Sequence, residues 1–320
     1  MYFELTEEEQ ILKQTLFEMT HEMTDQGVDA RGAWQTYREI GLAAVALDEQ
    51  RGGAGMSLNS LGIACQVIAE INPGWSVAMA MHNLAVLKAE KAGEGDAGLF
   101  KSMASGETLG TVALVGADGD PQCLDWTSFE GPVVLVSPTG DLLQSLDELD
   151  ELGQAHQSMG LDDFAVRGVN ESFQPAVAAS ESDATWDAIW ASVLIGFARG
   201  AFKTMVAYSE ERSQFGRPLS KFQAVQWMLA DSSTELDAAA LLTSRALATP
   251  GDARSAAAAA YYSGKICLAI TDRAIQVHGG YGFTLEYRPQ LFWRAARQIT
   301  SGVLGLSFRR HESLLATGKN

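Results

Sequence analysis

Two short segments in the last third of the chain carry residue types that suit the binding of a diphosphate group. The first reads Arg212-Ser-Gln214-Phe215-Gly-Arg-Pro-Leu219, and the second reads Gln276-Val-His278-Gly279-Gly280-Tyr-Gly-Phe283. A guanidinium is planar and matches a pair of phosphate oxygens. A glycine pair lets backbone N–H groups approach an anion without interference from Cβ atoms.

Each of these residues also has a simpler interpretation when it is considered alone. Arg212 could be a solvated charge at a helix end, Phe215 a core residue, and Gly279-Gly280 the C-cap of a helix. A lone histidine such as His278 is usually packed or hydrogen-bonded.

The elements that must position these segments follow a helix, sheet, helix order. Apolar residues recur at helical spacing from Thr6 to about Lys91, and the pair Thr6 and Glu9 resembles a capping box at the first helix. Short β-type runs broken by Gly, Pro and Asp follow from about residue 108 to 180, and helical spacing returns after Asp183. We predict domains at residues 1–107, 108–182 and 183–320, and a fold class of α+β that is mostly α.

Composition excludes several classes of partner. The chain has 320 residues and a net charge of −17, so its field repels nucleic acid and anionic lipid heads. Coenzyme A is also an anion, so a bound thioester would need a local basic group or a surface that belongs to another chain. We expect no nucleic-acid partner and no membrane partner.

Cysteine usage and the first residues indicate a reducing compartment. Cys65, Cys123 and Cys267 have no spacing typical of zinc sites or disulfides. The first ten residues carry acids where a signal peptide needs basic and apolar residues, and we expect no apolar run of membrane-spanning length. We predict a cytoplasmic protein.

The two segments quoted above resemble the flavin-binding part of acyl-CoA dehydrogenases. The match extends from Tyr208 through Gln226 and from Gln276 to Phe283, with Glu286-Tyr287 and Arg294 at the family's spacing. The resemblance implies an N-terminal helical domain, a shortened middle β domain, a C-terminal four-helix bundle and FAD as cofactor. It places Arg212 against the flavin pyrophosphate and Phe215 against the adenine. The cofactor-binding residues that it implies are Arg212, Gln214, Phe215, Gln223, Gln276, Gly279 and Gly280.

The base that this family needs is missing from both of its usual positions. The family removes the α-proton of an acyl-CoA thioester with a Glu while a hydride leaves the β-carbon for the flavin. Counting from Arg294 places Val303 in the first Glu position, and counting back from Gly196 places Trp186 in the second. Asp187 stands where relatives often have an arginine. It is a candidate for a displaced base, or an exposed carboxylate at a helix start.

The middle domain departs from the family as well. The segment Leu114–Asp120 replaces the usual flavin- and substrate-binding motif, and the region from Val115 to Thr185 is shorter than the family's sheet domain. In family dimers, segments like those at Arg212 and Gln276 grip the ADP half of the neighbour's flavin, while the sheet residues and the Glu serve the subunit's own flavin. The residues that act on the neighbour are therefore kept here, and those that act within the subunit are lost.

This pattern predicts the base-lacking subunit of a heteromeric α2β2 acyl-CoA dehydrogenase, inactive alone, like heterotetrameric relatives of sterol degradation in actinobacteria. Its partner would be a homologous subunit that carries the Glu, and electrons would pass to an electron-transferring flavoprotein. Two alternatives remain: a self-sufficient flavoenzyme that uses Asp187, and a flavin-free scaffold. The acyl chain, the electron acceptor and the stoichiometry are not determined by the sequence.

Overall fold

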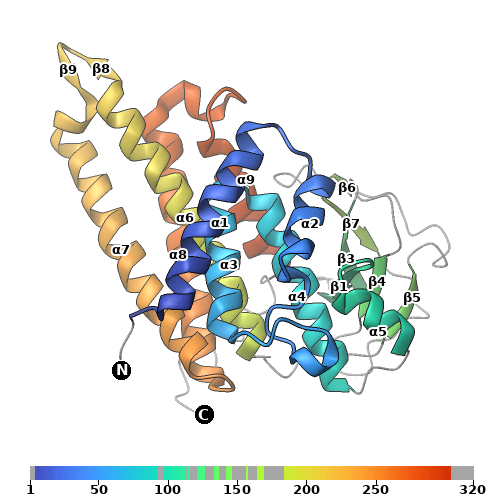
Figure 1. Cartoon of the computed structure of the whole chain (residues 1–320). Coiled ribbons are helices and arrows are strands. Elements are labelled where there is room, and N and C mark those ends of the chain that lie inside the picture. The colour runs from blue at the N-terminus through green and yellow to red at the C-terminus, as the bar shows by residue number, and fades with distance from the viewer. Residues whose placement is uncertain are drawn as a thin grey trace.

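The computed structural model describes residues 4–92, 97–112 and 184–303, together with six short strands between residues 114 and 168 (Figure 1). Helices make up both the N-terminal and the C-terminal parts of the described chain. The strands lie together at one side of the molecule, next to α4 and α5. The predicted fold class, α+β and mostly α, is confirmed.

Five α-helices form the N-terminal block. The first helix begins where the sequence predicted, because Thr6 accepts from the Glu9 N–H and the Glu9 carboxylate accepts from the Thr6 N–H. The glycine-rich segment from Gly52 to Met56 separates the short helices from α3, with Gly52 and Gly55 at positive φ. The elements are α1 (Glu7–Asp25), α2 (Ala30–Glu39), η1 (Leu42–Ala44), η2 (Glu49–Arg51), α3 (Leu58–Ile71), α4 (Pro73–Ala92) and α5 (Ala97–Ala104).

The described strands between residues 109 and 168 form two small sheets. One sheet has the order β1-β4-β5, in which β1 and β4 are parallel, and the other has the order β2-β3-β7-β6 with antiparallel pairs. The strands are β1 (Leu109–Val112), β2 (Leu114–Val115), β3 (Pro121–Trp126), β4 (Val133–Val136), β5 (Leu142–Ser145), β6 (His156–Gln157) and β7 (Phe164–Gly168).

The C-terminal part is a set of long helices built around α6. α6 packs against α3, α7, α8 and α9, and the alanine-rich stretches of α7 and α8 let these helices approach closely. The turn predicted at Thr249–Asp252 joins α7 to α8, with Gly251 at φ 87° and Asp252 as the N-cap of α8. The elements are α6 (Ala184–Glu211), β8 (Ser213–Gln214), β9 (Arg217–Pro218), η4 (Leu219–Lys221), α7 (Gln223–Ala248), α8 (Ala253–His278), η5 (Gly279–Phe283), α9 (Pro289–Gln298) and the π-helix η6 (Ile299–Val303).

Two glycines allow α6 to occupy the centre. A Cβ atom at Gly196 would overlap the backbone of α3 at Gln66, and one at Gly200 would overlap the ring of Phe292 on α9. Close packing at these two points lets the long apolar helix α6 lie against both α3 and α9.

The apolar character of α6 corrects one expectation from the sequence. By length and composition it could cross a membrane, although no run of that kind was predicted. The most apolar window of α6 is 72% buried inside the protein, which is the behaviour of a core helix. Helix α6 therefore supplies the central packing surface of the fold.

Candidate functional site

The first candidate segment forms a tight hairpin that projects from the end of α6 (Figure 1). Phe215 and Gly216 make its two-residue turn with φ values of 51° and 79°. Positive φ at both central positions is typical of a type I′ turn, which matches the twist of the flanking strands. The Phe215 ring is 93% exposed, so its interpretation as a core residue is wrong.

Phe215 is unusual in two respects. A left-handed backbone costs a non-glycine residue about 1 kcal/mol or more, and a fully exposed phenylalanine gains nothing from burial in this chain alone. Its ring makes an edge contact with Phe222 at 6.4 Å, and Phe222 in turn lies under the Arg217 guanidinium at 4.2 Å. The hairpin thus presents an aromatic ring outward from a strained turn, a feature that often marks ligand or partner sites.

The ends of α6 and α8 are joined by an aromatic cluster. Tyr208 stacks on His278 with ring centroids 4.1 Å apart, and Tyr287 contacts both rings edge-on. Tyr281 packs against Tyr287 and lies 5.9 Å from the guanidinium carbon of Arg212. The structure therefore brings Arg212 next to the second candidate segment, as the two motifs require.

His278 is part of this support. It is 4% exposed, and its Nδ1 lies 2.8 Å from the Ala274 carbonyl oxygen, which requires Nδ1 to donate. Burial lowers the pKa of His278 below its ordinary value, so the ring is neutral near pH 7. The interpretation as a packed, hydrogen-bonded histidine is confirmed.

The glycine pair has an open backbone. Gly279 is the C-cap of α8 with φ 61°, and a Cβ atom at either Gly279 or Gly280 would meet nothing within 4 Å. A ligand can therefore approach this backbone without displacing any described atom. The C-cap interpretation is confirmed, and the anion-binding interpretation stays a prediction for which the exposed backbone leaves room.

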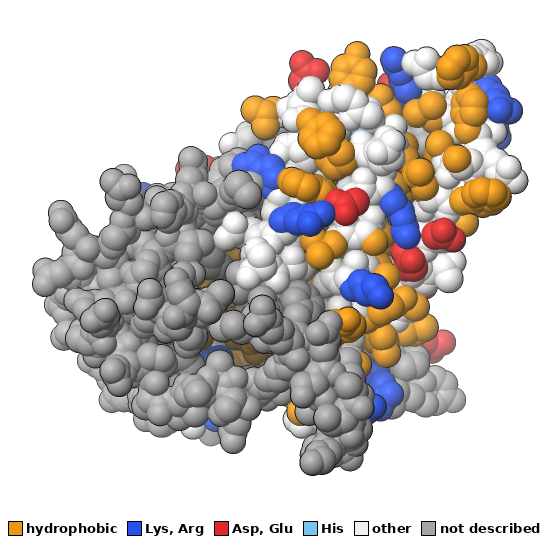
Figure 2. Space-filling view, turned by 180° about the vertical axis from the view of Figure 1, so that it is seen from behind, with side chains coloured by type: hydrophobic (Ala, Val, Ile, Leu, Met, Phe, Trp, Pro, Cys, Tyr) orange, Lys and Arg blue, Asp and Glu red, His pale blue; other side chains and the backbone are white. Residues whose placement is uncertain are grey.

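The remaining predicted residues are all on the surface. Gln276, Gln214 and Gln223 are exposed, the last as the first residue of α7. Figure 2 shows apolar and basic side chains interspersed over this end of the molecule, at the upper right. The large exposed apolar residues of the hairpin, η5, the segment after η5 and α7 are Phe215, Tyr281, Phe283, Leu285, Trp227 and Leu241.

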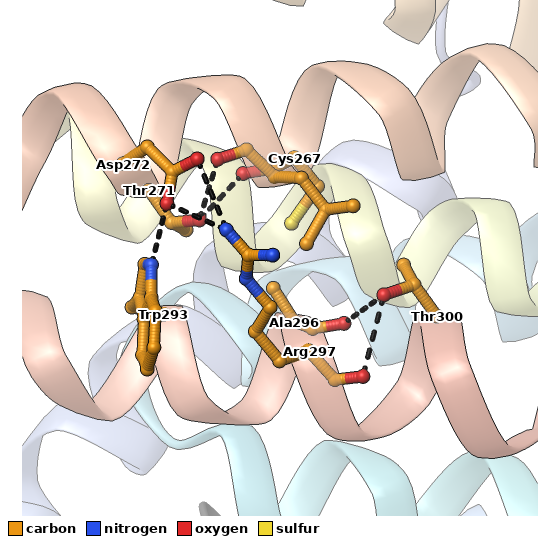
Figure 3. A network of polar contacts seen from close by, with 8 residues as sticks. Cys267, Thr271, Asp272, Trp293, Ala296, Arg297 and Thr300 are labelled. Carbon is orange, nitrogen blue, oxygen red and sulfur yellow. Dashed lines mark hydrogen bonds and ion pairs between the residues drawn. The ribbon is translucent and has the colours of Figure 1, made fainter.

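Val303, which the resemblance places at the first position of the family's Glu, lies in η6, directly after α9. Val303 closes the π-helix η6, and π-helical turns are frequent at functional sites. Asp272 on α8 holds α9 by accepting from Trp293 Nε1 at 2.5 Å and from Arg297 at 3.0 and 3.1 Å (Figure 3). Thr300 donates to the Ala296 carbonyl at 2.7 Å within the same turn. Asp272 and Thr300 therefore hold α9 and the start of η6, and a valine at position 303 has no acid–base chemistry.

The second position is filled by aromatic packing. Trp186 is 7% exposed, and its ring lies 5.7 Å from that of Trp190 and from the Lys88 ammonium. Asp187 is only 1% exposed, so the expectation of an exposed carboxylate at a helix start is wrong. The turn that carries Asp187 is covered because α6 passes through the centre of the fold.

The described residues fit the ADP half of a flavin better than its reactive ring. A guanidinium, exposed aromatic and amide side chains and an open glycine backbone suit a diphosphate and an adenine. Most of the segment Leu114–Asp120 lies outside the described residues. Within the described ranges, no group of three or more His, Cys, Asp or Glu side chains is arranged to hold a metal ion.

The sequence reasoning missed the aromatic support of Arg212. Tyr208 and Tyr287 stand some eighty residues apart, so no local pattern links them. The only available signal was the presence of tyrosines in or beside both candidate segments. The sequence also contained no sign that the indole N–H of Trp190 would be buried without a hydrogen-bond partner among the described residues.

Comparisons with known proteins agree with this architecture. Residues 6–106 match the family model described as the acyl-CoA dehydrogenase N-terminal domain, and residues 188–302 match the acyl-CoA dehydrogenase C-terminal domain. The caffeyl-CoA reductase–Etf complex subunit CarC of Acetobacterium woodii is 39% identical over 114 residues. That alignment covers 34% of this chain and only 30% of the relative.

Two further similarities extend over most of the chain. Acyl-CoA dehydrogenase IpdE2 of Mycolicibacterium smegmatis is 26% identical over 273 residues, which cover 81% of this chain and 78% of the relative. The ChsE4–ChsE5 complex from Mycobacterium tuberculosis contains a chain of the same fold, with a TM-score of 0.75, 18% identity and 99% of both chains covered. The two domain models together with these similarities show that the chain belongs to the acyl-CoA dehydrogenase family.

Proposed function

We propose that this protein is the base-lacking subunit of a heteromeric, FAD-dependent acyl-CoA dehydrogenase. The observation that carries the proposal is a contrast within the chain. Val303 and Trp186 occupy the two positions of the family's base, whereas Arg212, Gln276 and the glycine pair are retained and presented outward. Valine and tryptophan cannot accept a proton, so a homologous partner that carries the Glu would supply the base.

Bound FAD would supply the acceptor for the hydride that leaves the β-carbon of the acyl-CoA thioester. In this proposal, Arg212 pairs with the pyrophosphate and the Gly279-Gly280 backbone lies against it. Phe215 and the amides of Gln214, Gln223 and Gln276 contact the ADP half of a flavin whose ring is held by the partner subunit. The ring of Tyr281 makes a cation–π contact with the Arg212 guanidinium and so helps to position it.

The relatives support an assembly of this kind. Family members are FAD-dependent, and one structural neighbour is a chain of a two-protein complex, ChsE4–ChsE5. CarC is named as a subunit of a reductase complex with Etf, which supports an electron-transferring flavoprotein as the electron-transfer partner. A cytoplasmic location and a role in sterol or fatty acid degradation belong to the same proposal.

The alternative with Asp187 as a relocated base receives less support. A substrate would have to reach a side chain that is 1% exposed and that already interacts with other residues. A change of Asp187 to Asn tests it, since only a self-sufficient enzyme would lose activity as an isolated chain.

The deciding experiment is to purify the chain alone and together with a homologous subunit that carries the Glu. We expect flavin absorbance at roughly 450 nm and dehydrogenase activity only in the complex. Arg212→Gln in the complex should lower flavin content, while Arg254→Gln, at the opposite end of α8, should leave it unchanged. A lone chain that binds one flavin per subunit and is active would contradict the proposal. Flavin content that is insensitive to changes of Arg212 and Gln276 would favour a flavin-free scaffold.

A further inference from the structure

A second site lies far from the hairpin, in a surface cavity of about 430 Å³ between α1, α3 and α6. α1 lies against α3, and α3 lies against α6 (Figure 1). Residues of all three helices line the cavity. Its apolar wall is made by Leu5, Phe17 and Val67. A cavity of this size with an apolar wall and a few polar groups is typical of small-molecule sites.

The polar part of the lining is positively charged. Lys13, Arg199 and Lys203 face a single carboxylate, that of Glu70, although the whole chain carries 40 acidic and 23 basic side chains. Glu70 is nearly buried and forms an ion pair with Lys203, so these two charges neutralise each other. Lys203 also lies 4.9 Å from the centroid of the Phe17 ring, which fixes its position at the rim.

Arg199 and Lys13 are left with positive charge and no acid. When the side-chain amide of Gln66 is oriented with its oxygen toward Arg199, that oxygen accepts from the guanidinium and orients the cation without cancelling its charge. Within the part of the chain that the structure describes, neither Arg199 nor Lys13 forms an ion pair. Two uncompensated cations in one cavity of an acidic protein make a local site for an anion.

We propose that this cavity binds an aliphatic carboxylate. A planar carboxylate matches the Arg199 guanidinium, the Lys13 ammonium adds a second cation, and a short hydrocarbon chain would cover Phe17 and Val67. Inorganic phosphate would use the cations but leave the apolar wall exposed. The inference does not rest on the proposed function, because none of these residues belongs to the flavin-binding segments.

The test is a ligand-observed NMR titration of the full-length chain at pH 7 with three probes. Hexanoate has the charge and the chain, 1-hexanol has the chain alone, and phosphate has the charge alone. We expect hexanoate to bind saturably and at least tenfold more tightly than the other two, with an affinity that falls as salt is added.

Two variants test the cations separately. Arg199→Gln and Lys13→Gln should each weaken hexanoate binding at least tenfold, whereas Lys265→Gln, exposed on α8, should leave it unchanged. Lys13 lies on the outer face of α1, so its change leaves folding intact even if that of Arg199 does not. Equal binding of hexanol and hexanoate, unchanged binding in both variants, or no saturable hexanoate binding would overturn the proposal.

Discussion

The polar side chains of His82 and Asn83 on α4 are buried and hydrogen-bonded, whereas polar and aromatic side chains of the hairpin after α6 are exposed. Near α4, Asn83 accepts from the Val45 N–H at 2.9 Å and donates to the Leu42 carbonyl at 3.0 Å. His82 lies within hydrogen-bond distance of the Met103 carbonyl and accepts from the Gly110 N–H. At the hairpin, an aromatic ring and several amides point into solvent.

The difference separates residues that stabilise this chain from residues that a partner or ligand would use. The buried polar groups of Asn83 and His82 are satisfied within the chain, because an unpaired one costs about 1–3 kcal/mol. Exposed aromatic residues in a strained turn have no such internal function. Substitutions in the buried group should therefore change the free energy of unfolding more than substitutions at the hairpin.

The largest effect is expected at Asn83. Asn83→Leu would leave the buried Val45 N–H and Leu42 carbonyl without their partners, which should cost about 4 kcal/mol of unfolding free energy. Urea denaturation followed by circular dichroism measures the loss as a lower midpoint. Gln35→Leu, an exposed change on α2, should stay within about 0.5 kcal/mol of the parent protein. Equal midpoints for the two variants would show that Asn83 does not hold the loop.

Two buried tryptophans form a matched pair. Trp34 Nε1 donates to the Gly106 carbonyl at 3.0 Å, whereas Trp190 Nε1 has no hydrogen-bond partner among the described residues. Both changes to Phe remove similar volume, but only Trp34→Phe also breaks a hydrogen bond and leaves a buried carbonyl unpaired. We therefore expect it to destabilise the protein by about 2 kcal/mol more than Trp190→Phe. An equal loss in both variants would indicate that Trp190 also has a partner in solution, such as a buried water.

The third effect concerns pH. Burial lowers the pKa of His82 from 6.5 to about 4, so the unfolded chain binds this proton at a higher pH than the folded chain. Stability contributed by neutral His82 is therefore complete above pH 6.5 and is lost as the pH falls toward 4. Between pH 6.5 and 5 the loss should be about 1.5 kcal/mol.

Urea midpoints measured across this pH range give the slope for His82. His21 is exposed, so His21→Gln should keep the same slope, while His82→Gln should flatten it. If both variants retain the parent slope, another group is responsible for the pH dependence.

The smallest effect on stability is expected at the hairpin turn. Phe215→Gly removes an exposed ring and relieves a positive φ, so it should raise the unfolding free energy by up to about 1 kcal/mol. The same change should lower flavin content in the complex with the proposed partner. A clear loss of stability would mean that the ring has a structural function in this chain, which would remove the contrast with the α4 region.

Much of the fold could be predicted from the sequence because its signals are local. The capping box at Thr6, the turn at Thr249–Asp252 and the order of helices and strands follow from neighbouring residues. Two motifs in the right order also predicted that Arg212 and the segment of Gly279-Gly280 lie close together, and Arg212 does lie 5.9 Å from the ring of Tyr281. The domain boundaries and the roles of the cofactor-binding residues stay predictions.

Burial was the property that local patterns did not predict. Asp187 was expected to be exposed and is covered, and the core interpretation of Phe215 fails because its ring lies in solvent. Both outcomes depend on where α6 runs, and α6 is placed by contacts with α3, α8 and α9, which lie far from it in sequence.

By itself, the sequence determined that Val303 and Trp186 cannot accept a proton in any fold. It also determined the residue types available to a diphosphate. The tertiary structure alone decided that the ends of α6 and α8 meet through Tyr208 and His278. This contact places Arg212 beside Tyr281, the residue that follows the glycine pair. The physical reason is that side-chain identity is covalent, whereas proximity and burial arise from packing between distant segments.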